Sequence, residues 1–341
     1  MLMLLAPALA QAQTAQQVVQ RTRAAVVGIA VTPAAGDAGQ AEAPAGRPRD
    51  SADDAPGGSS TVTTAGQVVG SGTLVSADGL IVTAASLFER AGDILVTLDD
   101  GSRLPATLVG ADNRSNIALL RIARSGLAFL RPAAELSPAT GARVLALGRG
   151  TLEPDSFVTV TDGLLSAVFP ASGNYAPILQ ATAQTLPSMG GGPLLLESTG
   201  EFVGINSQRV VSRSGGYSLT FATPVSIYPR IAGDLLRVGR VERAVLGVSA
   251  AAVTEEMRAT LGLPRREGVL LTTVRPHSAA ERAGLERGDI VLTVNGRTVA
   301  AMGDLFGAVD AAPVGTTHTI TYVHLGKILT TQATSELAPH R

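Results

Sequence analysis

Several residue types are absent or scarce in this chain of 341 residues. It has no cysteine and no tryptophan, and aromatic residues make up 3%. The absence of cysteine excludes disulfides, thiolate metal sites and a cysteine nucleophile. The four histidines are His277, His318, His324 and His340. Residues 1–276 therefore contain no imidazole, and neither a metal nor a cofactor is expected, because a zinc site would have to be built without cysteine and with histidine from one end only.

The remaining composition is that of a globular protein, with 45% hydrophobic and 16% charged residues. At this length two domains or slightly more are expected. A net charge of −1 gives no electrostatic basis for binding nucleic acid.

The N-terminal residues are apolar, with the sequence MLMLLAPALA, and the first charge is Arg21. This run is too short to span a membrane. With the small residues that follow Ala8, it is typical of a secretory signal and its cleavage site, although the usual positive charge before it is missing. We interpret residues 1–13 as a signal segment and expect a periplasmic or otherwise exported protein. The alternative is a frayed apolar terminus.

The rest of the chain divides into segments of different character. Residues 14–27 have helical spacing, and residues 33–66 consist of Pro, Ala, Gly, Asp and Ser with almost no large apolar residue, which predicts a disordered loop. From Val68 onward, short β-rich runs alternate with turns, which predicts a sandwich or a pair of barrels. A helix is expected over 225–238. A second unit with strands and two short helices begins near Arg243.

Several stretches together resemble one known family. They are GSGTLVSADGLIVTAASLF, DNRSNIALLRI, TDGLLSAV, GGGPLLLESTGEFVGINS and VRPHSAAERAGLERGDIVLTVNGRTV. Residues 14–239 resemble the protease domain of the high-temperature-requirement (protease Do) family, and residues 243–336 resemble its PDZ domain. The resemblance implies a mainly β protein: a trypsin-like double β-barrel followed by an α+β PDZ domain.

The positions that correspond to the family's catalytic triad hold other residues. The histidine's place is taken by Ser86, in Thr-Ala-Ala-Ser-Leu, and the aspartate's by Asn116, before Ile-Ala-Leu. The nucleophile motif becomes Ser-Met-Gly-Gly-Gly-Pro-Leu, which puts Gly190 in place of the serine. Such a protease needs an imidazole to move the proton of its nucleophile. We therefore expect no catalytic residues and no protease activity.

Substitute chemistry is poorly supported by the sequence. Ser86 and Ser188 carry hydroxyls near the expected cleft, but a hydroxyl without a base stays protonated at neutral pH. A Ser–Lys dyad is excluded because the lone lysine, Lys327, lies in the other domain. The motif segments offer one carboxylate, that of Asp112. The alternative interpretation is a periplasmic serine endopeptidase of protein quality control, which fold-level similarity alone would assign.

The PDZ-like segment keeps the family's peptide-binding features. The resemblance implies that backbone amides of the turn at Leu246, Gly247 and Val248 hold a peptide's terminal carboxylate, while the peptide adds as a strand. The facing helix supplies Leu305, Phe306 and Val309, some of which must also be core.

The expected partners are peptides or the C-termini of unfolded proteins. The chain would be an inactive homologue that binds them or regulates an active relative of the same family, and an adaptor in which the barrels are only a spacer is a third hypothesis. Members of the family commonly trimerise through aromatic residues near the N-terminus. This chain has no aromatic residue before Phe88, so the oligomeric state stays open.

Overall fold

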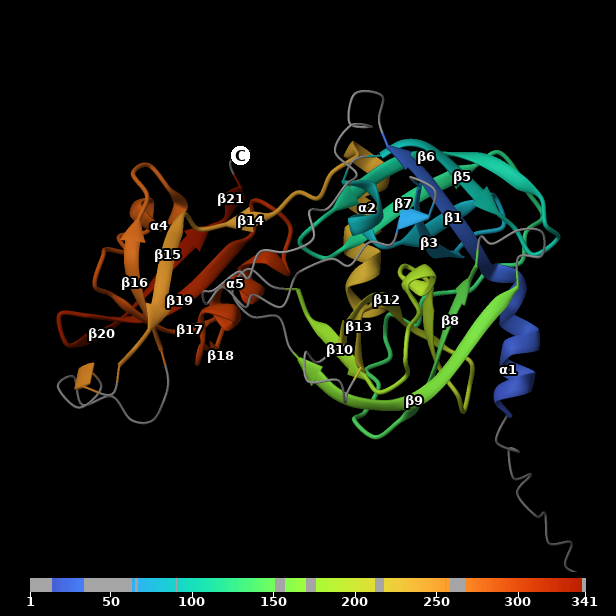
Figure 1. Ribbon diagram of the computed structural model, residues 1–341. Helices are drawn as coiled ribbons and strands as arrows, with labels where there is room; N and C mark the ends of the chain where they lie inside the picture. The colour runs from blue at the N-terminus through green and yellow to red at the C-terminus, as the bar shows by residue number, and fades with distance from the viewer. Residues whose placement is uncertain are drawn as a thin grey trace, which may run out of the picture. The chain divides into compact units, whose positions relative to one another are not determined.

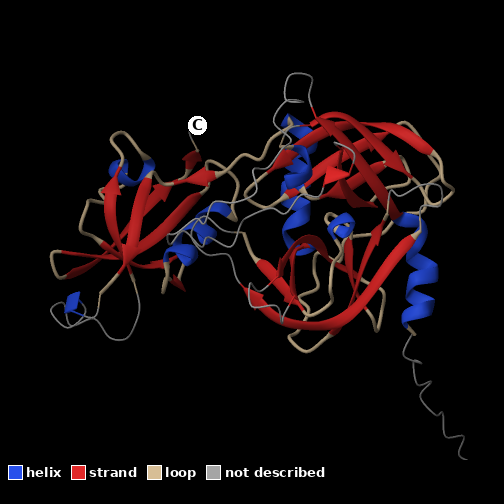
Figure 2. Cartoon of the chain, viewed as in Figure 1, coloured by secondary structure: helices blue, strands red, loops and turns tan. Residues whose placement is uncertain are grey.

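The computed structural model (Figures 1 and 2) describes residues 14–33, 63–64, 67–89, 91–150, 157–169, 176–211, 218–254, 256–257 and 268–338. The chain divides into two compact units, one ending at Gly239 and the next beginning at Arg240. The expected signal segment 1–13 and most of the expected loop 33–66 lie outside the described residues. Among the described residues, no helix has the length and apolar character needed to cross a membrane.

Six strands of the first unit close into a barrel. They are β1 (Val26–Pro33), β3 (Gln67–Leu74), β4 (Leu80–Thr83), β5 (Ala91–Thr97), β6 (Arg103–Asp112) and β7 (Ile117–Ile122). Their order is β1-β5-β6-β7-β4-β3, and pairing of β1 with β3 completes the ring. β2 (Thr63–Thr64) adds to β3 inside the stretch expected to be a loop. Val27, Ile29, Ile81 and Leu120 fill the interior and are fully buried.

A second closed barrel follows in the same unit. Its strands are β8 (Arg143–Arg149), β9 (Val158–Phe169), β10 (Ile178–Ala181), β11 (Pro193–Leu196), β12 (Phe202–Val211) and β13 (Ser218–Pro224), in the order β10-β13-β12-β11-β8-β9. Val144, Leu165, Leu179 and Leu194 form much of its core. The two barrels confirm the expected mainly β, trypsin-like class.

Short helices connect and cover the barrels. They are α1 (Ala15–Thr22), η1 (Arg23–Ala25), η2 (Ala85–Phe88), η3 (Pro187–Met189), η4 (Val225–Ile227) and α2 (Tyr228–Val238). α1 starts with a capping box between Thr14 and Gln17. α2 ends at Gly239, whose φ of 73° places it in the left-handed region where glycine is favoured. Its buried face, which includes Ile231 and Leu235, packs on the first barrel at β6 and β7.

A fully buried arginine joins the two barrels. Arg149, at the end of β8, donates from Nε to Val26 O at 2.7 Å and from Nη2 to Asp99 Oδ1 at 2.6 Å. Burial by itself raises the pKa of Asp99, but hydrogen bonds from Arg149 and Arg23 outweigh it and bring that pKa below its usual value. Asp99 is therefore held as a carboxylate at the barrel interface.

The described part of the second unit has a sheet with short helices. Its main strands are β15 (Val248–Ala252), β16 (Val269–Val274), β17 (Ile290–Val294), β19 (Thr317–His324) and β20 (Lys327–Thr334), in that order, and β18 (Arg297–Thr298) pairs with β17. β14 (Ala244–Val245) pairs separately with β21 (Glu336–Leu337). The helices are α4 (Ala279–Arg282) and α5 (Met302–Asp310). Among the described strands, β15 has β16 as its sole partner and is an edge strand.

Candidate functional site

Two of the three triad positions are linked by hydrogen bonds in the first barrel. Ser86 lies in η2, directly after β4, and Asn116 lies in the turn between β6 and β7. The backbone N–H of Ser86 donates to Asn116 Oδ1 at 2.9 Å, and the N–H of Ala85 donates to Asn116 O at 3.2 Å. Asn116 has a φ of 54°, a left-handed conformation that asparagine tolerates better than most residues.

The third position, Gly190, lies in the second barrel and is held against the first. Ser71 of β3 donates from its backbone N to Gly190 O at 2.7 Å and from Oγ to Ser188 O at 2.6 Å. Ser71 Oγ also accepts a hydrogen bond of 2.8 Å from the backbone N–H of Arg149. One serine of the first barrel therefore fixes the loop that replaces the nucleophile loop.

Close packing around Gly191 brings this loop to the segment that precedes Ser86. Gly191 has a φ of 86°, and a Cβ there would overlap Ser71 O and Thr83 Oγ1 and lie 2.9 Å from Ala84 N. A larger residue cannot occupy this position without moving backbone atoms. The fold thus gathers Ser86, Asn116 and the Gly190 loop where the two barrels meet.

The three positions gathered there carry a hydroxyl, an amide and no side chain. Position 190 has no side chain, and the part of the chain that forms both barrels contains no histidine. Asp112 is the last residue of β6, and its Oδ2 accepts hydrogen bonds from the Ser115 backbone N at 2.9 Å and from Ser115 Oγ at 2.5 Å. Among the described residues there is also no group of three or more His, Cys, Asp or Glu side chains that could hold a metal ion.

The turn at Leu246, Gly247 and Val248, which is expected to bind a peptide carboxylate, lies between β14 and β15 of the second unit. Gly247 has a φ of 81°, and a Cβ there would overlap Ser278 Cβ. The carbonyls of Leu246 and Gly247 accept hydrogen bonds from Ala280 N at 2.9 Å and Arg275 N at 2.8 Å. In a trans peptide the N–H points opposite to the preceding carbonyl. The amide of Gly247 therefore points away from α4, and the amide of Val248 points away from the backbone of Arg275.

The six residues expected to bind peptide divide into two groups. Leu246, Leu305 and Val309 are at most 4% exposed and belong to the core of the second unit, so they offer little surface to a ligand. Gly247, Val248 and Phe306 are partly exposed. Met302, which the sequence interpretation missed, is exposed one turn before Phe306 on the same side of α5. The i, i+4 spacing from Phe306 was the available signal.

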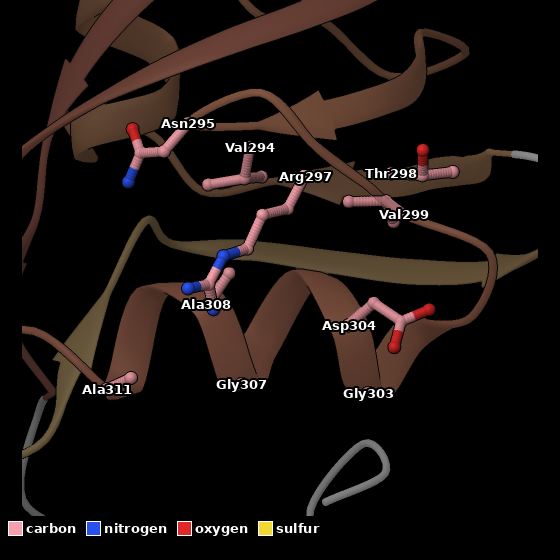
Figure 3. Close-up of a pocket in the computed structure, with 10 residues that line it drawn as sticks. All are labelled: Val294, Asn295, Arg297, Thr298, Val299, Gly303, Asp304, Gly307, Ala308 and Ala311. Atoms are coloured by element: carbon pink, nitrogen blue, oxygen red, sulfur yellow. The ribbon is translucent and has the colours of Figure 1, made fainter. Parts of the chain in front are cut away.

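A cavity of about 550 Å³ lies along another face of α5 (Figure 3). It is lined by Val294, Asn295, Arg297, Thr298 and Val299 from β17 and β18, and by Gly303, Asp304, Gly307, Ala308 and Ala311 from α5 and its end. At 100° per residue, these helix positions point away from Met302 and Phe306. The cavity is therefore separate from the expected peptide groove.

Comparison with known proteins agrees with this architecture. Residues 70–205 match the family model of the trypsin-like peptidase domain, and residues 270–323 match that of the PDZ domain. The chain is 35% identical over 265 residues to the "Probable periplasmic serine endoprotease DegP-like" of Pseudomonas fluorescens, with 76% of this chain and 54% of that protein covered. It is 39% identical over 241 residues to the protein of that name from Marinomonas sp., with 70% and 50% covered. The chain spans about half the length of these relatives.

Solved structures resemble the whole fold. The HtrA-type protease AlgW with a tripeptide superposes with a TM-score of 0.77 at 24% identity, covering 96% of this chain and 98% of that one. AlgW with a decapeptide gives a TM-score of 0.74 at 25% identity, covering 96% of this chain and 100% of that one.

Since the curated relatives are named periplasmic, the expected exported location is confirmed. The chain belongs to the high-temperature-requirement (HtrA) family, with a trypsin-like peptidase domain followed by a PDZ domain.

Proposed function

We propose that this HtrA-family protein is a pseudoprotease of the periplasm. Its PDZ domain binds peptides or the C-termini of unfolded proteins, or the chain regulates an active protease of the same family. The observation that carries the proposal is the constellation of Ser86, Asn116 and Gly190, which occupies the places of the triad residues without an imidazole, a carboxylate or a nucleophile.

The expected loss of activity is large. In subtilisin, removal of the whole triad lowers turnover by about 2 × 10⁶, which corresponds to roughly 8–9 kcal/mol of transition-state stabilisation. Binding and an oxyanion hole alone leave about 10³–10⁴ over the reaction in water. A protein with three such replacements has no imidazole in its barrels to take the proton from Ser86 or Ser188, the hydroxyls near the expected cleft.

The PDZ domain supplies the positive part of the proposal. The Gly247 amide points away from α4 and the Val248 amide away from the backbone of Arg275, and β15 is an edge strand among the described strands, to which a peptide could add. Two similar structures, of the protease AlgW, are named as complexes with a tripeptide and a decapeptide. Peptide binding at β15 follows the same architecture.

A serine endopeptidase of protein quality control is the second candidate, and the names of the relatives favour it. Incubation of the purified protein with unfolded casein and a fluorophosphonate serine probe separates the two. We expect no cleavage and no labelling. Labelling at Ser86 or Ser188, or cleavage that survives repurification and disappears in an S86A or S188A variant, would make the chain an enzyme. A Gly190→Ala variant is the control for a contaminating protease, because it adds no reactive group.

Peptide binding is tested separately by calorimetry. We expect a peptide with a free C-terminus and an apolar last residue to bind with a micromolar Kd, about −8 kcal/mol. Amidation of that terminus removes charge-assisted hydrogen bonds worth about 1.5–3 kcal/mol each and should weaken binding at least tenfold. Absence of binding by either form would favour an adaptor role in which neither domain uses its ancestral site.

A further inference from the structure

The last strand of the main sheet in the second unit, β20, has a free edge. Among the described strands β20 pairs with β19 alone, so one row of its backbone N–H and C=O groups has no strand beside it (Figure 1). The pairing with β19 runs without a shift in register from His324 opposite Lys327 to Thr317 opposite Thr334. The free edge is therefore eight residues long and regular, and a further strand can join an edge of this kind.

The turn between β19 and β20 fixes which backbone groups point toward the free edge. It consists of Leu325 and Gly326, whose φ values of 48° and 78° are those of a type I′ hairpin. The residues that flank such a turn, His324 and Lys327, exchange both backbone hydrogen bonds, and bonding then alternates along the strands. The backbone groups that point away from β19 are therefore those of Ile328, Thr330, Gln332 and Thr334.

This edge lacks the features that usually keep edge strands from associating. Such strands commonly carry a proline, a bulge or charged side chains. The residues from Ile328 to Thr334 include none of these, and the one charge of β20, on Lys327, lies at its first residue. Ile328 and Leu329 are 69% and 41% exposed, and Leu325 in the adjoining turn is 90% exposed. Apolar side chains grouped at an open edge indicate a contact surface.

The residues of this edge are compatible with a second copy of the same strand. In an antiparallel pair of two β20 strands centred on Thr330, this residue meets its own counterpart, and threonine pairs are favourable across strands. The two Lys327 residues are then six residue spacings apart, or about 20 Å. A parallel pair in register would bring these lysines together. An edge strand that is already folded also loses less conformational entropy on binding than an extended peptide, which must first be ordered.

We propose that β20 is a homodimerisation edge, at which two copies of this chain join through antiparallel β20 strands into one continuous sheet. Both copies use the same surface, so the contact closes after two copies. It covers Ile328 and Leu329 and pairs the outward backbone groups of both strands. The opposite edge of the sheet, β15, stays free for the peptide that the proposed function assigns to it.

Sedimentation equilibrium of the full chain over a range of concentrations tests the pair. We expect the wild type to reach twice the mass of a T330K variant, in which two like charges would face each other at the centre of the contact, and the dissociation constant of T330K to be about tenfold higher or more. T298K is the matched control and should keep the wild-type mass, because Thr298 is an exposed threonine of β18 in the same unit. Equal masses for the wild type and T330K at every concentration would overturn the proposal. Wild-type species that keep growing instead of doubling would overturn the closed pair.

Cross-linking locates the contact by a separate measurement. The chain has no cysteine, so a single introduced thiol reports on one position. At the centre of the antiparallel pair, Thr330 and its counterpart would have Cα atoms about 5.5 Å apart, which is within disulfide range. T330C should therefore form a cross-linked dimer with oxidised glutathione on non-reducing electrophoresis, whereas T298C should not. Cross-linking of both variants to the same extent, or of neither, would overturn the pair centred on Thr330.

Discussion

The backbone N–H of Ser86 donates a hydrogen bond of 2.9 Å to the side-chain oxygen of Asn116. The bond ties η2 to the β6–β7 turn, and an aspartate at position 116 could accept it equally well with one oxygen. The difference lies in the other terminal atom of the side chain. A carboxylate would offer a second acceptor, whereas the amide offers an NH₂ donor. Positions 86 and 116 are therefore joined by a hydrogen bond, and their side chains end in a hydroxyl and an amide.

Stepwise restoration of the triad should show the effect of that amide. An S86H/G190S variant regains a base and a nucleophile. The Asn116 oxygen, however, already accepts from the backbone N–H of residue 86, and the other end of the amide is an NH₂ group that cannot accept a hydrogen bond from the imidazole N–H. The same aspartate-to-asparagine change in trypsin lowers turnover by about 10⁴. We expect S86H/N116D/G190S to cleave casein about that much faster than S86H/G190S. Equal rates for the two, or activity of G190S alone, would contradict this account of the site.

Asn116 should also contribute to stability, through its side-chain acceptor and through its left-handed backbone. N116D keeps the acceptor and should unfold near the wild-type urea midpoint. N116G loses a hydrogen bond worth about 0.5–1.5 kcal/mol but tolerates a φ of 54°. N116A loses the hydrogen bond and adds left-handed strain of about 1–2 kcal/mol. If N116A unfolded at a higher urea concentration than N116G, the left-handed backbone at position 116 would cost alanine no stability.

The buried Arg149 should be the most sensitive charged residue of the barrels. An R149M variant leaves Asp99 without its shortest ion pair, and removal of one partner from a buried pair costs about 3–5 kcal/mol, which the partial exposure of Asp99 reduces. R121M is the control, because Arg121 and its partner Asp78 are both exposed and the unfolding free energy should barely change. Urea denaturation of the two variants measures the difference. Equal effects would mean that Arg149 does not link the barrels.

Local patterns in the sequence were sufficient to predict much of the fold, but they predicted less of the candidate sites. Apolar runs at 80–83 and 117–122 predicted strands that the structure has, whereas Ser86, Asn116 and Gly190 were singled out by the family resemblance. The burial of Leu305 and Val309 depends on how α5 packs, which the spacing of apolar residues does not specify. The ion pair between Arg275 and Glu336 joins residues 61 positions apart, and no local pattern indicates such a contact.

Acidification should destabilise the second unit through His318. This residue is fully buried, its Nδ1 lies 3.2 Å from Asn295 Nδ2, and its Nε2 has no partner among the described residues. Burial lowers the pKa of His318 below 6.5, so near and below that pH the unfolded chain binds a proton that the folded domain resists. The free energy of unfolding should fall as the pH drops below about 6.5 and level off below the folded-state pKa.

Thermal denaturation of the full chain at pH 5.5 and 7.5 measures this effect. The drop in the midpoint of the second unit should shrink in an H318F variant, which keeps a buried ring without a titrating nitrogen. H277N is the control, because His277 is exposed and asparagine tolerates its φ of 58°. The same pH dependence in H318F as in the wild type would assign the effect to another group.

Alanine at Gly247 should abolish peptide binding for a reason that differs from simple backbone strain. Gly247 and Gly296 have φ values of 81° and 76°, so alanine at either position costs about 1–2 kcal/mol. A Cβ at Gly247 would also overlap Ser278 Cβ, whereas a Cβ at Gly296 would meet no atom within 4 Å.

G247A should therefore lose more stability than G296A. It should also displace the amides that are expected to receive the peptide carboxylate. G296A should lose stability alone and bind the free-acid peptide with wild-type affinity, because its turn lies outside the groove. Wild-type peptide affinity in G247A, measured by the same calorimetric titration, would show that the ligand does not use this turn.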